Sequence, residues 1–172
     1  LQDFIRNKDR FSFPEKIGEG ITLHRAIDTF TDAHPEIHEA KKVFNPLVRL
    51  YSGAFVDVAF DYFLANSIPD KTLKDLSERV YRVLRNHEEI FPENFLRMLD
   101  SMEEDNWLYN YREDWGIKFS IQNVLNKAKY LDKDTAVFDV FLKHKAQLQV
   151  HFDAFFPDLL VEVQRINETF NH

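Results

Sequence analysis

The stretch of sequence that decides the fold is Gly53-Ala-Phe-Val-Asp-Val-Ala-Phe-Asp-Tyr-Phe-Leu-Ala65, because it is apolar at almost every position. With about 3.6 residues per turn, its apolar side chains cover nearly all faces of a helix, which is therefore predicted to be buried. Positions four apart share a face, so Asp57 and Asp61 lie one above the other. Burial of two ionised carboxylates costs several kcal/mol each unless arginines or a metal ion compensate them. This pair is the first indication of a functional site.

A second helix, predicted over residues 15–31, carries a matching polar pair. One narrow stripe of this helix consists of Ile17, Ile21, His24 and Asp28. The apolar stripe thus continues as imidazole and carboxylate, which suit Mn²⁺, Fe²⁺, Zn²⁺ or Mg²⁺ as ligands. We expect His24, Asp28 and Asp61 to converge within a metal-sized space. The plainer alternative is that each pair is a hydrogen-bonded polar group of the core.

The composition favours a single all-α domain over residues 1–172. The chain has 172 residues, which fits one domain, and its 17 phenylalanines predict a bulky core. Only four glycines and six prolines leave few tight turns. No segment shows the period of a strand, so we expect a bundle of seven or eight helices.

Prolines and glycines indicate where the helices begin and end. Pro35 fits the first position of a helix, and the neighbouring His34 and His38 are interpreted as surface residues. Trp115-Gly116 is predicted to stop a helix before the next one begins at residue 117. Pro157 is predicted to kink or interrupt the last long helix.

Several classes of function are disfavoured by what the sequence lacks. A net charge of −7 argues against a nucleic-acid partner, and the absence of cysteine excludes thiolate metal sites and thiol nucleophiles. No apolar stretch approaches the about 20 residues that a membrane span needs, and no signal peptide is visible. Phosphate-binding glycine loops, serine nucleophile elbows and the zinc-peptidase motif are missing as well. We expect a cytoplasmic protein without a membrane partner, for which metal-assisted hydrolysis is the main enzymatic option; the oligomeric state stays open.

Basic residues gather locally in spite of the acidic total. Arg79, Arg82 and Arg85 form one ridge at helical spacing, and further clusters comprise Lys41, Lys42 and Arg49, and Lys127 and Lys129. The ridge is interpreted as a solvated face balanced by nearby glutamates. The alternative is a docking surface for an acidic partner.

The segment Gly20-Ile-Thr-Leu-His-Arg-Ala-Ile-Asp-Thr-Phe-Thr-Asp32, followed by His34-Pro35-Glu36, resembles the signature of the acyl carrier protein phosphodiesterase family. Further stretches agree with that family in the same order, and the resemblance covers essentially the whole chain. They are Asp3-Phe4 ahead of Phe13-Pro14-Glu15, Val56-Asp57-Val58 with Phe60-Asp61-Tyr62-Phe63-Leu64-Ala65, and Ile121-Gln-Asn-Val-Leu-Asn126 followed by Phe155-Phe156-Pro157.

This resemblance implies a helical domain distantly similar to the HD-type metal phosphohydrolases. Such an enzyme would use Mn²⁺, or another divalent cation such as Mg²⁺ or Fe²⁺. It would cut the bond between 4′-phosphopantetheine and a serine of holo-acyl carrier protein, an acidic partner, to give apo-acyl carrier protein and 4′-phosphopantetheine. The matching positions assign the metal site to Asp3, His24, Asp28, Asp57 and Asp61. In this interpretation Asp28 or Asp61 orients or deprotonates water, and Arg25 contacts the phosphate.

The sequence also departs from the family pattern. The family usually begins with a Met-Asn-Phe-Leu-Ala-His type segment ahead of the position of Leu1, so we expect a short N-terminal segment to be missing. Tyr62 replaces a histidine, and Lys127-Ala-Lys-Tyr130 replaces a Met-x-Ser-Arg type stretch. Two alternatives to the carrier-protein phosphodiesterase therefore stay open: a non-catalytic helical binding module, and an HD-like hydrolase of another phosphoester.

Overall fold

The computed structural model describes residues 13–170, and its regular elements in that range are helical throughout. In chain order they are α1 (Glu15–Ala33), α2 (Pro35–Val48), the 3₁₀ turn η3 (Arg49–Tyr51), α3 (Ser52–Ser67), α4 (Asp70–Arg85), the 3₁₀ turn η4 (Glu88–Ile90), α5 (Glu93–Glu104), α6 (Trp107–Asn110), α7 (Asp114–Lys127) and α8 (Val137–Thr169). The predicted all-α fold and its number of helices are confirmed, whereas the likeness to HD-type enzymes stays a prediction.

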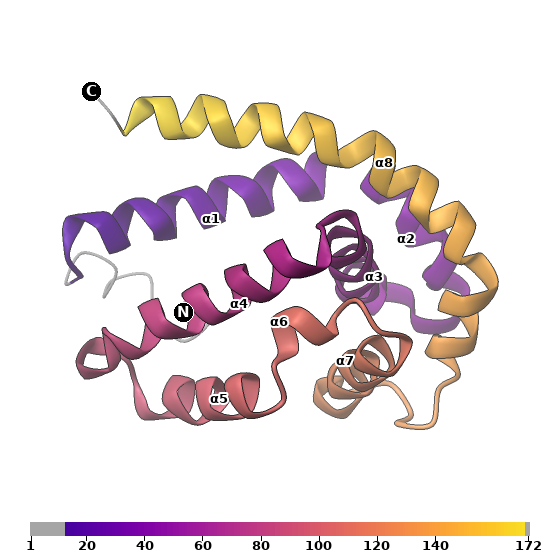
Figure 1. Ribbon diagram of the computed structural model, residues 1–172. Helices are drawn as coiled ribbons and strands as arrows, with labels where there is room; N and C mark the ends of the chain where they lie inside the picture. Colours follow the sequence, from indigo (N-terminus) through magenta and orange to yellow (C-terminus); the bar gives the residue numbers. More distant parts are fainter. Residues whose placement is uncertain (1–12, 171–172) are drawn as a thin grey trace.

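The helix that carries Asp57 and Asp61, α3, lies at the centre of the molecule. Figure 1 shows the long α8 curving over α2 and then running beside α1, with α3 enclosed between this arc and α7. The main core joins α2, α3, α7 and α8, and its largest fully buried side chains include Phe44, Phe55, Phe63 and Phe141. A smaller apolar cluster joins α4 and α5. Of the described helices, none is long and apolar enough to cross a membrane.

Two predicted helix boundaries are wrong. Helix α7 begins at Asp114 and runs through Gly116, because glycine there allows the backbone of Asn110 to pack closely. A Cβ added at Gly116 would lie 2.1 Å from the carbonyl oxygen of Asn110. Helix α8 continues through Pro157, so the predicted interruption is wrong, whereas the alternative of a kink stays a prediction. Packing of α8 along α1 and α2 outweighs the one backbone hydrogen bond that a proline removes.

The interpretation of His34 as a surface residue is also wrong. Its side chain is only 11 % exposed, and its Nδ1 accepts the backbone N–H of Glu36 at 3.2 Å, which caps α2. The ring packs edge-on against Phe155 of α8, with centroids 5.0 Å apart. His38 is exposed as expected. His34 therefore ties the turn between α1 and α2 to α8.

Candidate functional site

Asp57 and Asp61 lie on a strip of α3 that solvent reaches. Their neighbours Val56, Val58 and Phe60 are buried, whereas both aspartates are exposed. The expectation that both carboxylates are buried is therefore wrong. The reason is that α2, α7 and α8 cover the other faces of α3 and leave this strip open.

Two hollows meet at Asp57. The first, here called the polar depression, is lined by Asp32, Lys41, Asn45, Arg49, Leu50, Ser52, Gly53, Ala54 and Asp57. The second, here called the apolar cleft, encloses about 150 Å³ and is lined by Thr31, Asp57, Phe60, Asp61, Leu64, Phe152, Phe155, Phe156 and Leu159. The two carboxyls thus stand between a hollow with cationic side chains and a hollow with aromatic walls.

The walls of these hollows displace water from both carboxyls even though the side chains remain accessible. This desolvation raises the pKa of Asp61 to about 7, and the charge of Asp57 contributes in the same direction. Desolvation likewise raises the pKa of Asp57 to about 6; Lys41 opposes this increase, and the charges of Asp32 and Asp28 add to it. A carboxyl pair that titrates near neutral pH can both accept and donate protons.

The polar pair of α1 does not turn inward as predicted. Ile21 is buried, but His24 and Asp28 are exposed, with Nδ1 of His24 3.0 Å from Oδ2 of Asp28. Helix α1 packs mainly against α8 and α2, which leaves the polar half of its stripe toward solvent. Asp28 is still close enough to Asp57 for its charge to act on that carboxyl.

The donors fit a divalent cation in type but are not assembled around one point. Among residues 13–170, no three His, Asp or Glu side chains lie close enough together to hold a metal ion. The predicted convergence of His24, Asp28 and Asp61 is therefore wrong for this arrangement of side chains, and Asp3 lies outside the described residues. Imidazole nitrogen and carboxylate oxygens nevertheless suit Mn²⁺ or Mg²⁺, and the like charges around Asp57 would be relieved by a cation.

Two cations beside Asp57 were not recognised as site residues in the sequence. Lys41 and Arg49 were grouped with the surface basic clusters, but both line the polar depression. The Nζ of Lys41 lies 3.1 Å from the carboxylate of Asp32. Arg49 has a φ of 51°, which is unfavourable for a residue with a side chain. Only the turn between α2 and α3 brings these residues to the carboxyls, so sequence spacing gave no signal for them.

Arg85, at the end of the basic ridge of α4, is paired with acidic side chains. Arg85 donates hydrogen bonds of 2.8 Å to each of Glu88, Asp100 and Glu103. This arginine therefore ties α4 to η4 and α5, in line with a ridge balanced by nearby acids.

The departure at Tyr62 falls on a different face of α3 from the carboxyl pair. The ring of Tyr62 packs edge-on against Phe141 of α8, and the Nζ of Lys145 lies 4.1 Å from its centroid. The same Nζ donates a hydrogen bond of 2.9 Å to Asp114. Burial lowers the pKa of Lys145, but its interactions with Tyr62 and Asp114 outweigh this effect and raise it. Tyr62 thus belongs to the packing between α3 and α8.

Comparison with known proteins identifies the family. The profile of the acyl carrier protein phosphodiesterase family matches residues 1–159. The chain belongs to this family. The acyl carrier protein phosphodiesterase of Escherichia coli O157:H7 (strain EC4115 / EHEC) is 31 % identical over 96 % of this chain and 88 % of its own length. The protein of that name from Yersinia pestis is 28 % identical over 95 % and 87 %. No solved structure matches the chain.

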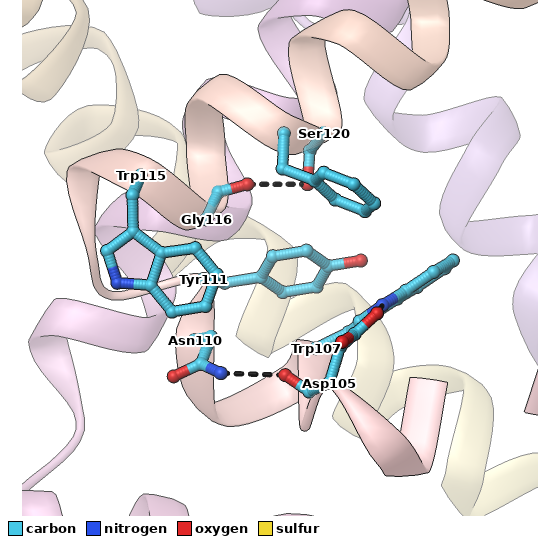
Figure 2. Close-up of a pocket in the computed structure, with 8 residues that line it drawn as sticks. Asp105, Trp107, Asn110, Tyr111, Trp115, Gly116 and Ser120 are labelled. Carbon is cyan, nitrogen blue, oxygen red and sulfur yellow. Dashed lines mark hydrogen bonds between the residues drawn. The ribbon is translucent and has the colours of Figure 1, made fainter. Parts of the chain in front are cut away.

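This member of the acyl carrier protein phosphodiesterase family has a further pocket, on α6 and α7 (Figure 2). The aromatic pocket, as it is called below, encloses about 110 Å³ and is lined by Asp105, Trp107, Asn110, Tyr111, Trp115, Gly116, Phe119 and Ser120. Burial raises the pKa of Tyr111, and the charge of Asp61 contributes to this increase. The charge of Asp61 therefore acts on a residue that lines the aromatic pocket.

Proposed function

We propose that the protein is a metal-dependent phosphodiesterase that releases 4′-phosphopantetheine from holo-acyl carrier protein and leaves apo-acyl carrier protein. The observation that carries the proposal is the carboxyl pair Asp57 and Asp61, which titrates near neutral pH between a cationic and an apolar hollow in a chain of this family. A cytoplasmic location and a part in fatty acid biosynthesis belong to the same proposal.

The two carboxyls can perform the proton transfers that hydrolysis requires. Water adds its oxygen to phosphorus, and the ionised member of the pair Asp57/Asp61 accepts the proton that this water loses. The bond between phosphorus and the serine oxygen breaks, and the protonated member of the pair returns a proton to that oxygen. The reaction then balances with one water consumed. Because the two carboxyls interact, their pKa values belong to the pair, and the proton is not assigned to one aspartate.

The cations of the polar depression would neutralise the phosphate. Lys41 and Arg49 line this hollow together with Asp57, so a phosphodiester next to the carboxyl would meet positive charge on the same side. An arginine can donate two parallel hydrogen bonds to a phosphate, which a lysine cannot. Arg25 on α1 remains our candidate for a further phosphate contact.

The metal would be Mn²⁺ or another divalent cation such as Mg²⁺ or Fe²⁺. His24 and Asp28 of α1, together with Asp3, would hold it, and Asp57 and Asp61 would lie next to it and stay free for proton transfer. When bound, such an ion supplies Lewis-acid chemistry at water and phosphate oxygens. The carboxyl pair and the cations of the polar depression then serve proton transfer and phosphate binding.

The proposal is tested by incubating the purified protein with holo-acyl carrier protein, with Mn²⁺ or with a chelator. Mass spectrometry of the carrier protein should show loss of the 4′-phosphopantetheine group with Mn²⁺ and no loss with the chelator. Metal content of the purified protein is measured in parallel. Binding of the carrier protein without hydrolysis would instead indicate a non-catalytic module, and hydrolysis of small phosphoesters alone would indicate another substrate.

A further inference from the structure

The carboxyl pair has the polar depression on one side and the apolar cleft on the other, and this difference can orient a substrate. Resting on the function proposed above, we propose that the pantetheine arm lies in the apolar cleft between α1, α3 and α8, while the carrier protein contacts the turn at Arg49 and Leu50. The phosphate then lies over Asp57, where the two hollows meet.

The apolar cleft suits the part of the arm that lies next to the phosphate. At about 150 Å³ it is too small for a protein helix, which is about 10–12 Å across with its side chains. Phe152 and Phe155 form its buried floor, and the partly exposed Phe156 and Leu159 form its rim. The pantetheine arm is slender and carries two geminal methyl groups close to its phosphate. An apolar wall directly beside Asp57 and Asp61 would contact those methyl groups.

The turn between α2 and α3 presents an exposed apolar side chain next to positive charge, which suits contact with an acidic protein. Leu50 is 99 % exposed at the edge of the polar depression, so its side chain is available to a partner. Arg49 before it and Lys41 across the hollow place positive charge around this apolar tip. An acidic carrier protein complements such a surface, even though this chain carries a net charge of −7. The serine half of the substrate therefore fits this side.

The two halves of the proposal can be separated with two substrates. One is holo-acyl carrier protein, and the other is the methyl ester of 4′-phosphopantetheine, a phosphodiester that has the arm but no protein. Leu159→Ser should lower kcat/KM about tenfold for both substrates, because both place the arm against Leu159. Leu50→Ser should lower the ratio of kcat/KM for the carrier protein to that for the methyl ester about tenfold.

Each variant has a matched control. Leu160 follows Leu159 on α8 but is 53 % exposed and outside the cleft, so Leu160→Ser should leave both activities unchanged. Leu47→Ser is the corresponding control on α2. If Leu159→Ser unfolds the protein, as judged by circular dichroism, Leu159→Trp tests the same point by filling the cleft, and should lower both activities.

The orientation is overturned if Leu159→Ser weakens turnover of the carrier protein but not of the methyl ester. It is also overturned if Leu50→Ser weakens both substrates equally. Failure of the proposed function looks different, because the wild-type protein would then release 4′-phosphopantetheine from neither substrate.

Discussion

The carboxyl site and the aromatic pocket are built in opposite ways. All residues that line the aromatic pocket come from positions 105–120, and most of its surface is apolar. The carboxyl site collects residues from α1, α2, α3 and α8. It also contains the carboxyls whose pKa values lie near neutrality. The comparison teaches that both regions contain a hollow and that their chemistry distinguishes them.

The largest expected effect is on catalysis at the carboxyl site. Asp61→Asn keeps the size of the side chain but removes proton transfer, so we expect kcat for release of 4′-phosphopantetheine to fall about 10²–10⁴-fold. Asp134, an exposed aspartate in the loop before α8, is the control, and Asp134→Asn should retain full activity. Near-normal activity of Asp61→Asn would remove the main distinction between the two regions.

A glycine beside the aromatic pocket should affect stability and spare the chemistry. Gly116→Ala places a methyl group against the carbonyl oxygen of Asn110, and we expect this overpacking to cost about 1–3 kcal/mol of unfolding free energy. Gly18 lies in α1 with open space around it, so Gly18→Ala should stabilise by about 0.5–1 kcal/mol. Urea denaturation measures both changes. A loss of turnover by folded Gly116→Ala would show that the two regions are coupled.

The raised pKa of Asp61 predicts a pH-dependent effect on stability. This carboxyl has a pKa of about 7 in the folded protein, against an ordinary value of 3.8. Between these values the folded state binds more protons than the unfolded state, so the contribution of Asp61 to stability falls as the pH rises through this window. With a chelator present, Asp61→Asn should therefore melt above the wild-type protein at pH 8, and this advantage should shrink at pH 5. An equal difference at both pH values would contradict the raised pKa.

The smallest expected effect is at the rim of the aromatic pocket. Trp115 is 58 % exposed, so Trp115→Ala should change the unfolding free energy by no more than about 0.5 kcal/mol. Turnover of holo-acyl carrier protein should be unchanged, as followed by mass spectrometry. A selective loss with the carrier protein, and not with a small diester, would instead show that the aromatic pocket contacts the substrate.

Local pattern was sufficient to predict the fold class and the family. The apolar run through Phe55 and Phe63 predicted a central buried helix, because a helix that is apolar on nearly all faces has to be covered by others. The start of α1 at Glu15 and that of α2 at Pro35 agreed with the sequence signals. The family resemblance found in the motif from Gly20 to Asp32 is confirmed by the match over residues 1–159.

Tertiary structure alone decided which surfaces meet. Spacing placed Asp57 and Asp61 on one face of α3 but could not say that α2, α7 and α8 leave that face open. The approach of Lys41 and Arg49 to Asp57 depends on the turn between α2 and α3, and the burial of His34 depends on α8, more than a hundred residues away. Periodicity records which side chains share a face of their own helix. Exposure and pKa depend on the neighbouring helices that cover that face, and these are brought together only by the fold.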